Sequence, residues 1–322
     1  MEAFDPNDYM QWLKLTSKQS LPPLIITVAV TGGVQGKETH PDHPESAEEQ
    51  VAQIHDCYKL GATQVHLHVR QPKALGFASP DPKEYYKVNG MIREKCPEII
   101  INNTTGGGLG MDPTDENRMA PVLANPETCS LDMGRTVTRF TLKKRLPPLT
   151  GTREQDVAFE AVQGVSFKET EKFAKAMLEH NIKPEMELWS TGDYDLVNNL
   201  IELKLIKPPY LLQAVMGYSS GARATVKEVI HLVEHGPKDG VYSVLGVGLF
   251  SPIMCALGIL MGINVRTGME DTILYKKGEL CKNNAQLVER VVRMARDMGR
   301  EIATPKQARQ MMGVSEKPTK YG

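Results

Sequence analysis

Two histidines, His66 and His68, are two residues apart in the segment VHLHVR, which reads as a β-strand over residues 63–69. Alternate side chains of a strand point to the same face, so both imidazoles lie on one side with their Cα atoms about 6.5–7 Å apart. This spacing lets both rings bind one metal ion, although two such histidines can also be plain core or surface residues. The pair stands at the carboxyl end of its strand, where barrel enzymes build their active sites, and this favours a metal site.

Glu270 is the leading candidate for a third metal ligand. Catalytic zinc sites usually take three protein side chains and leave one position for water or substrate. Glu270 follows a predicted strand over residues 263–268, so in a closed barrel it would reach over the same mouth as the histidines. Two alternatives remain open at this stage: Glu270 could cap the next segment, and His40 and His43 in the loop THPDHPE could be rival ligands.

A second candidate site is the turn Thr104-Thr105-Gly106-Gly107, which ends a strand predicted over residues 98–103. Glycines let a ligand approach the backbone, and free N–H groups together with two hydroxyls can hold an anion. We expect a substrate carboxylate to bind at this turn. The spacing does not match a phosphate-binding P-loop, and a run of glycines can also be only a flexible turn.

Charged and polar residues also occur inside predicted strands. Ser130 and Asp132 share one face of the fourth strand by alternation, and Ser130 is a further candidate for substrate binding. Glu185 and Glu187 share one face of the fifth strand in the same way. Acids inside a barrel need partners, and Arg266 on the eighth strand is an available one.

The fold that must position these residues is predicted by eight β-branched runs that alternate with amphipathic segments. Eight βα units in about 280 residues favour a (β/α)₈ TIM barrel over a doubly wound sheet. Capping-box residues, Ser46 with Glu49 and Ser166 with Glu169, mark two of the helix starts. The strands are predicted at 24–30, 63–69, 98–103, 128–132, 184–189, 210–215, 241–246 and 263–268, with a final long helix at about 279–299.

Two segments lie outside the βα repeat. Residues 1–22 form an N-terminal extension, and residues 23–322 form a single barrel domain with a C-terminal helical tail. Residues 135–165 make a long insertion after strand four that carries basic and Pro-rich patches. Such an insertion on the catalytic face usually forms a lid, a specificity loop or a subunit contact.

Composition excludes several classes of function. The 322 residues include 38 Lys+Arg and 39 Asp+Glu, so the net charge of −1 argues against a nucleic-acid or anionic-membrane surface. No stretch approaches the 18 apolar residues that a membrane span needs, and the acidic start does not resemble a signal peptide. Five cysteines without a CxxC pair favour a reducing compartment, and we therefore expect a cytoplasmic protein.

At these same residues the chain resembles the β-keto acid cleavage enzymes, the family typified by 3-keto-5-aminohexanoate cleavage enzyme. The resemblance runs from about Leu24 to Val314 and is carried by ITVAVTGG, GATQVHLHVR, NTTGGG, LDMG, KPEMEL, NVRTGMED and KGELCKNNAQLVERVVRMARDMGREIATPKQAR. It implies a zinc-dependent (β/α)₈ barrel, usually oligomeric and often a tetramer. It also implies acyl exchange between a β-keto acid and acetyl-CoA, giving acetoacetate and a new acyl-CoA.

The resemblance assigns roles to individual residues. It implies that His66, His68 and Glu270 are the metal ligands, in agreement with their spacing. It further implies that Asp271 performs proton transfer and that Arg266 orients it. A zinc-dependent retro-aldolase or hydrolase of a related keto acid is the nearest alternative, because the same metal site would equally activate an aldol or a water. A non-catalytic barrel is a third.

The chain departs from the family pattern in two places. Where the typical member has a glutamate just after the Thr-Gly of strand one, this chain has Gly33 and Val34, so we expect a neutral, apolar or anionic substrate side group. The insertion 135–165 is the other departure and leaves the contacts with coenzyme A open. Its basic residues could meet coenzyme A phosphates, although exposed loop charge is the simpler interpretation; they are Arg135, Lys143, Lys144 and Arg145.

Overall fold

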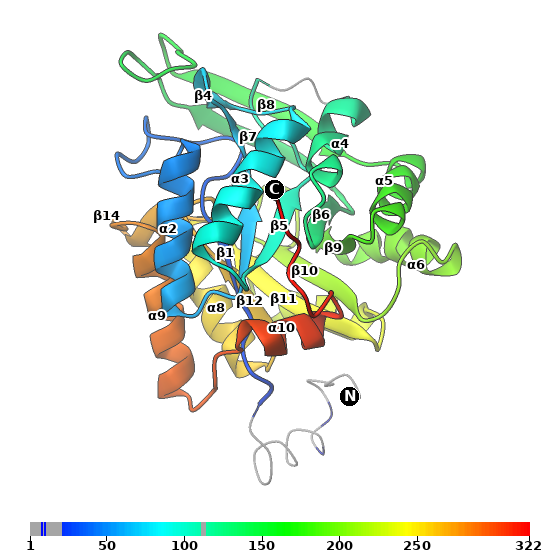
Figure 1. Ribbon diagram of the computed structural model, residues 1–322. Coiled ribbons are helices and arrows are strands. Elements are labelled where there is room, and N and C mark those ends of the chain that lie inside the picture. The colour runs from blue at the N-terminus through cyan, green and yellow to red at the C-terminus, as the bar shows by residue number, and fades with distance from the viewer. Residues whose placement is uncertain (1–7, 9, 11–20, 111–113) are drawn as a thin grey trace.

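A computed structural model describes residues 8, 10, 21–110 and 114–322 of the chain. Eight parallel strands close into a barrel in the order β1-β12-β11-β10-β9-β6-β5-β2, with helices around them (Figure 1). This arrangement confirms the predicted (β/α)₈ TIM barrel. The predicted N-terminal extension, residues 1–22, lies almost entirely outside the described residues.

The barrel strands agree closely with the apolar, β-branched runs of the sequence. Thr27 of the first strand pairs with Arg266 of the last, which closes the ring. The strands are β1 (Ile26–Ala29), β2 (Gln64–Leu67), β5 (Ile100–Thr104), β6 (Thr128–Asp132), β9 (Lys183–Leu188), β10 (Tyr210–Met216), β11 (Gly240–Gly246) and β12 (Asn264–Thr267).

Most of the described helices, but not α6 and α8, begin after a residue whose side chain caps them. The capping boxes of Ser46 with Glu49 and Ser166 with Glu169 both form, and each satisfies free N–H groups at a helix start. The helices are α2 (Ala47–Leu60), α3 (Pro82–Lys95), α4 (Asp115–Leu123), α5 (Phe167–Glu179), α6 (Tyr194–Glu202), α7 (Val226–His235), α8 (Ser251–Leu260), α9 (Asn284–Asp297) and α10 (Pro305–Met312), with short 3₁₀ turns η1 (Thr191–Asp193) and η2 (Gly248–Phe250).

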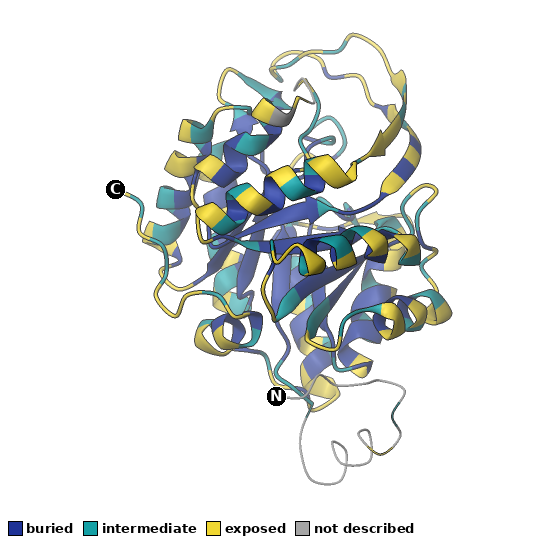
Figure 2. Cartoon of the chain, turned by 90° about the vertical axis from the view of Figure 1, so that its right-hand side faces the viewer, coloured by how far each residue is buried: buried dark blue, intermediate teal, exposed yellow. Residues whose placement is uncertain are grey.

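The core lies between the strands and the surrounding helices. Figure 2 shows the barrel strands buried while the helices expose one side. At the amino-terminal end of the strands, α10 closes the barrel, because Ala308 and Met312 pack against Ile25, Ile100 and Leu211. This end is filled by apolar side chains, which leaves the carboxyl ends of the strands for chemistry.

The final helix starts later than the sequence predicted. Residues 279–283 are not helical: β13 (Leu274–Lys276) and β14 (Glu279–Leu280) form a small antiparallel hairpin. Asn283 then caps α9 by accepting a hydrogen bond from the backbone N–H of Gln286. The prediction of a helix from residue 279 was therefore wrong by five residues.

The insertion after strand four is an antiparallel hairpin rather than an irregular loop. Its strands β7 (Arg135–Leu142) and β8 (Val157–Gly164) pair along their whole length. The hairpin lies at the same end of the barrel as a smaller hairpin, β3 (Arg70–Gln71) with β4 (Ala74–Ala78), which follows β2 (Figure 1). Both insertions therefore stand on the side where active sites of barrels are found.

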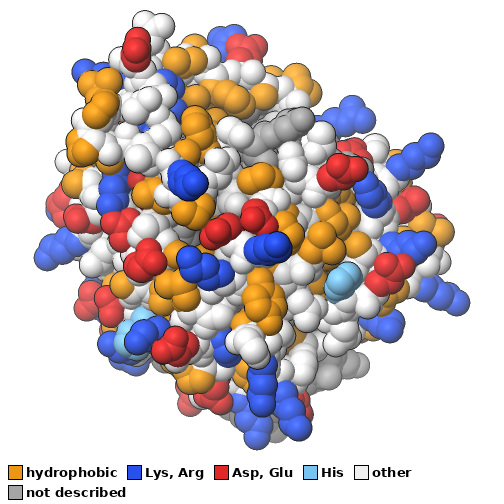
Figure 3. All heavy atoms as spheres, turned by 45° about the horizontal axis from the view of Figure 1, so that its top comes forward, with side chains coloured by type: hydrophobic (Ala, Val, Ile, Leu, Met, Phe, Trp, Pro, Cys, Tyr) orange, Lys and Arg blue, Asp and Glu red, His pale blue; other side chains and the backbone are white. Residues whose placement is uncertain are grey.

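The surface facing this end mixes charge and apolar groups. Figure 3 shows acidic, basic and apolar side chains interspersed over it.

Within the described ranges, no helix has both the length and the apolar character to cross a membrane.

Candidate active site

The two histidines and Glu270 meet at the mouth of the barrel. His66 Nε2 lies 3.3 Å from Glu270 Oε1, and His68 Nε2 lies 3.6 Å from the same oxygen. One histidine belongs to β2 and the other follows it directly, while Glu270 comes three residues after β12. The structure thus brings together all three residues that the sequence suggested as metal ligands.

These three side chains fit a transition-metal ion. One ligand atom from each residue lies within 4.8 Å of the others, and no other group of this kind occurs among the described residues. The buried Oε2 of Glu270 has no hydrogen-bond partner, which leaves an acceptor unsatisfied inside the cluster. Burial and the neighbouring Arg266 charge lower the pKa of His66 to about 4, so its ring is neutral near pH 7. Two imidazoles and a carboxylate are a donor set that Zn²⁺ takes with a position left open.

Arg266 lies next to this cluster and donates hydrogen bonds to the acidic side chains around it. Its Nη2 and Nε donate to the two carboxylate oxygens of Asp271 at 2.9 and 3.3 Å, and Nη2 also donates to Glu270. Its Nη1 donates to Glu187 at 3.3 Å and to Gln213 at 3.1 Å. Burial raises the pKa of Asp271 to about 6, and the Arg266 charge opposes that rise. Arg266 is therefore the partner of the interior acids, as the sequence suggested.

The turn after β5 lies beside the same mouth. Thr104 Oγ1 accepts hydrogen bonds from the Gly106 N–H at 3.0 Å and from the Ser130 hydroxyl at 3.2 Å, so its own O–H is available to a ligand. Thr105 instead donates its hydroxyl to the Ser130 carbonyl at 2.7 Å. Gly107 has φ of 78°, a conformation that favours glycine. The turn thus offers a free donor at Thr104, and the carboxylate contact remains a prediction for Thr104 and for the other residues of the turn.

Asp132, at the end of β6, is a further acid next to this turn. A Cβ placed on Gly106 would lie 3.5 Å from Asp132 Oδ2. Burial raises the pKa of Asp132, while Arg118 and a hydrogen bond from the Trp189 side chain act in the opposite direction. The shared face of Ser130 and Asp132, read from the sequence, therefore points into the mouth.

The rival ligands His40 and His43 do not join the cluster. His40 Nε2 is 2.6 Å from the carbonyl of Cys281, and His43 Nε2 is 2.7 Å from the carbonyl of Thr31. Both rings are buried and hold loop backbone in place. The alternative that they bind the metal is therefore wrong in this structure.

The segment Gly32–Gln35 follows β1 and lies inside the site; the sequence pointed to Gly33 and Val34 through the family resemblance but missed Gln35. Gln35 Nε2 donates to the carbonyls of Met269 at 2.7 Å and Glu270 at 3.2 Å. A Cβ on Gly33 would lie 2.7 Å from the Gly107 carbonyl oxygen and 3.1 Å from His68 Nδ1, so no side chain fits there. The signal that could have extended the site to Gln35 was the pair of glycines, Gly32 and Gly33, shortly after strand one.

Deeper in the barrel, Glu185 gives a prediction about stability and pH. It is buried, accepts a hydrogen bond from Asn102 at 2.7 Å, and burial raises its pKa to about 7. An unfolded glutamate releases its proton near pH 4.5, so the folded protein loses stability as pH rises from there to about 7. Glu185→Gln stays neutral at every pH. The free energy of unfolding of the variant relative to the wild type should therefore increase by about 2–3 kcal/mol between pH 5 and pH 8.

Chemical denaturation at these two pH values checks this prediction. Glu179→Gln, an exposed change on α5, is the matched control. Its free energy of unfolding should differ from that of the wild type by the same amount at both pH values. If the free energy of unfolding of Glu185→Gln relative to the wild type did not change with pH, this would contradict the claim that the buried Glu185 carboxyl binds a proton up to about pH 7.

Comparisons with known proteins agree with this geometry. The family model described as beta-keto acid cleavage enzyme matches residues 23–314. The 3-keto-5-aminohexanoate cleavage enzyme of Fusobacterium nucleatum is 36% identical over 293 residues, which cover 91% of this chain and 98% of that enzyme. The 3-oxoadipate:acetyl-CoA acetyltransferase of Cupriavidus necator is 28% identical over 295 residues, covering 91% of this chain and 95% of that enzyme.

A solved structure, the ternary complex of ObcA with C4-CoA adduct and oxalate, is similar with a TM-score of 0.67. It covers 85% of this chain and 68% of that chain at 16% sequence identity, so the likeness concerns the fold alone. The family match, in contrast, extends over nearly the whole barrel and includes every residue of the cluster at its mouth. The chain is therefore an enzyme that belongs to the beta-keto acid cleavage enzyme family.

Proposed function

We propose that this enzyme exchanges acyl groups between a β-keto acid and acetyl-CoA, giving acetoacetate and a new acyl-CoA, with Zn²⁺ bound by His66, His68 and Glu270. The observation that carries the proposal is the position of the Arg266–Asp271 pair directly beside the three candidate ligands. The names of several relatives, which include acetyl-CoA-dependent transferases, support the same reaction class.

A bound Zn²⁺ would supply Lewis acidity toward the ketone oxygen of the substrate, which makes the neighbouring CH₂ group acidic. The protein's own part in that step is the base. Asp271 is held by two hydrogen bonds from Arg266, which fix the direction of its carboxylate. It removes a proton from the CH₂ between the ketone and the carboxylate.

The substrate carboxylate binds at the Thr104–Gly107 turn. Thr104 offers its hydroxyl, and the backbone N–H groups of a glycine-rich turn add donors without a side chain in the way. Ser130 holds the Thr104 oxygen and so keeps the hydroxyl oriented. Thr105 holds the turn against β6 by donating its hydroxyl to the Ser130 carbonyl.

The remaining steps balance without another reactant. The substrate carbanion attacks the thioester carbonyl of acetyl-CoA, which forms a carbon–carbon bond and releases coenzyme A as thiolate. The thiolate then attacks the original ketone carbon, and the bond from that carbon to the former CH₂ breaks. Asp271 returns its proton to the released carbon, giving acetoacetate and the new acyl-CoA.

A panel assay tests the proposal. Zinc-loaded protein is mixed with acetyl-CoA and β-keto acids that carry neutral, acidic, bulky or cationic side groups, and new acyl-CoA is detected by mass. We expect a product from neutral or acidic members. If no β-keto acid of the panel gave a new acyl-CoA although zinc was bound, the result would contradict the proposed reaction.

Val34 gives a prediction about the substrate side group. It is half-buried between two residues that contact the site, Gly33 and Gln35, and carries no charge. Val34→Glu would place an acid there, so we expect the ratio of kcat/KM for an ammonium-bearing β-keto acid over a neutral one to rise by about tenfold or more.

The matched control for this change is Val226→Glu at the exposed start of α7. It introduces the same charge at an exposed helix position that makes no contact with the three candidate ligands, and it should leave the ratio unchanged. An unchanged ratio for Val34→Glu would show that residue 34 does not face the side group.

The second candidate function is a zinc-dependent retro-aldolase or hydrolase of a keto acid, which the same metal cluster would serve. Omitting acetyl-CoA separates the two, because an aldolase or hydrolase would still turn over. We expect no turnover without acetyl-CoA.

The proposal also includes the oligomeric state and the cellular location of the enzyme. We expect a homo-oligomer, with a tetramer as one form, and a cytoplasmic location. All five cysteines are buried and free, which suits a reducing compartment. Light scattering of the purified protein would give the oligomeric state.

A further inference from the structure

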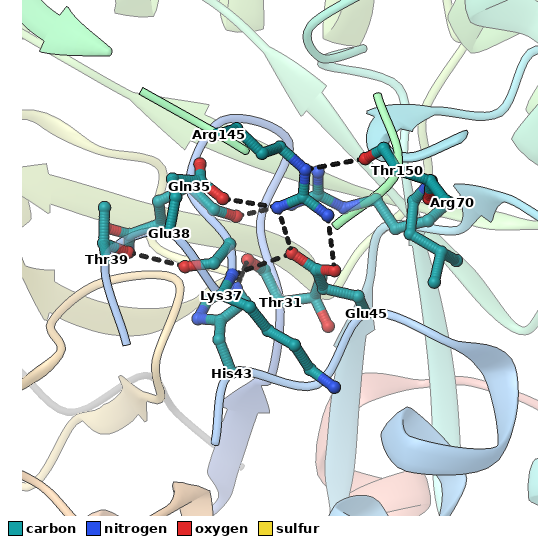
Figure 4. A network of polar contacts seen from close by, with 12 residues as sticks. Thr31, Gln35, Lys37, Glu38, Thr39, His43, Glu45, Arg70, Arg145 and Thr150 are labelled. Atoms are coloured by element: carbon teal, nitrogen blue, oxygen red, sulfur yellow. Dashed lines mark hydrogen bonds and ion pairs between the residues drawn. The ribbon is translucent and has the colours of Figure 1, made fainter. Parts of the chain in front are cut away.

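Arg145, in the loop that connects β7 to β8, is fully buried although it lies outside the barrel and the cluster described above. Its Nη1 and Nη2 donate to the two carboxylate oxygens of Glu45, each at 2.7 Å, and Nη1 also donates to Glu38 (Figure 4). Its Nε donates to the carbonyl of Thr150 at 2.7 Å. With four bonds made inside the protein, this guanidinium is not an exposed loop charge and does not reach coenzyme A phosphates. For Arg145 both of those interpretations of the sequence are therefore wrong.

Glu45, which accepts two hydrogen bonds from Arg145, is buried and ionised. Burial disfavours the ionised form of Glu45, but the hydrogen bonds from Arg145 and from the Lys37 N–H keep its pKa below the usual value. Arg153 adds a second guanidinium, 3.4 Å from Glu38. Such a buried network is costly to break, because removing one partner leaves the other charge without compensation.

Glu38 and Glu45 belong to the loop between β1 and α2, and the start of that loop lies against the metal cluster. Arg70, which follows His68 by two residues, donates to the carbonyls of Gly32 at 2.5 Å and Gln35 at 2.8 Å. Gln35 in turn donates to the carbonyl of Glu270. The same loop thus touches Arg145 at one end and the backbone of a metal ligand at the other.

The fit around this path is tight. A Cβ on Gly32 would lie 2.8 Å from Glu270 Cγ, and a Cβ on Gly36 would lie 2.1 Å from Glu45 Oε1. On the other side, a Cβ on Gly76 in the β3–β4 hairpin would lie 2.8 Å from Arg145 Nε. Residues 32–36 are therefore packed closely against Glu270 at one end and against Glu45 and Arg145 at the other.

We propose that Arg145 is a positioning residue of the metal site: it locks the loop of Glu38 and Glu45 so that Gly32–Gln35 hold Glu270 and His68 in place. The inference rests on the proposed function for the identity of the metal ligands. It gives the insertion a defined role, since the insertion supplies the guanidinium that fixes the loops beside two of the three ligands.

The test measures metal binding apart from activity. Zn²⁺ affinity of purified metal-free protein is determined by competition with a chromophoric chelator, and thermal unfolding of the same samples is recorded. Arg145→Met should bind Zn²⁺ about 10- to 100-fold more weakly, the range seen when groups that support metal ligands are lost. Arg145→Lys should recover part of the affinity, because it restores the charge but not the two-pronged contact.

Two further variants make the result decisive. The double variant Arg145→Met/Glu45→Gln removes one positive and one negative charge together, which limits unfolding by an unpaired buried acid; it should still bind Zn²⁺ at least about tenfold more weakly. Arg139→Met is the control on the same hairpin, because the ion pair of Arg139 with Glu160 is exposed. Its affinity should equal that of the wild type.

A folded Arg145→Met or double variant that binds Zn²⁺ as tightly as the wild type would overturn the inference, as would a wild type that binds no Zn²⁺ at all. Failure of the proposed reaction is distinguishable from both. In that case the wild type binds Zn²⁺ through His66, His68 and Glu270 but gives no acyl-CoA, and the dependence on Arg145 is still measured.

Discussion

His66→Ala should remove bound zinc and lower kcat/KM for acyl exchange by at least about 10³-fold, which corresponds to about 4 kcal/mol. The ring lies at the carboxyl end of β2 with its Nε2 3.3 Å from Glu270 Oε1, and the remaining pair of ligands would hold a metal poorly. Because alanine leaves a small cavity but no buried charge, the barrel itself should still fold. Metal content of the purified protein and the rate of acyl-CoA formation check the prediction together.

The control for this variant is His180→Ala, an exposed histidine after α5. It should keep full metal content and activity. A fully metallated and active His66→Ala protein would show that the ligand assignment is wrong.

Asp271→Asn should retain zinc but lower kcat by about 10²- to 10⁴-fold, because the amide cannot accept the substrate proton. Asparagine has nearly the same shape and can still accept a hydrogen bond from Arg266, so the three ligands should remain in place. The specific signature is proton exchange. With acetyl-CoA omitted, the wild type should exchange the substrate CH₂ protons with deuterated water faster than the background, and the variant should not.

Asp297→Asn, at the exposed end of α9, is the matched change outside the site and should behave like the wild type. If Asp271→Asn turned over at the wild-type rate, another group would have to be the base.

The sequence predicted the barrel well, because each strand is a short β-branched run between clear helix starts. The candidate metal cluster was also predictable, since closure of a barrel brings two histidines on one strand face and a glutamate after the last strand to the same mouth. The structure confirms that His66, His68 and Glu270 do meet. What the meeting point binds and catalyses is still a proposal.

The insertion was harder to predict because its structure depends on distant partners. The alternation in Arg135–Leu142 is that of a strand, but its basic and Pro-rich flanks suggest a loop. The burial of Arg145 depends on Glu38 and Glu45, which lie about a hundred residues earlier in the chain. No local sequence pattern shows that an arginine in a basic stretch will be buried and form ion pairs with two distant acidic residues.

The position of Gln35 was missed for a similar reason. Its side chain donates to two backbone carbonyls around Glu270, and backbone acceptors carry no residue-specific signal in a sequence. The start of α9 was misplaced because the apolar periodicity alone does not reveal the small β13–β14 hairpin in front of it.

The central claim is that this enzyme transfers the acetyl group of acetyl-CoA onto the carbon chain of a β-keto acid. The most direct test supplies acetyl-CoA labelled with ¹³C in both acetyl carbons, together with zinc-loaded protein and an accepted β-keto acid. Mass spectrometry of both products then locates the label. The account predicts that acetoacetate carries both ¹³C atoms and that the acyl group of the new acyl-CoA carries none. Label that stays in acetyl-CoA or appears as free acetate while the keto acid is consumed would contradict it.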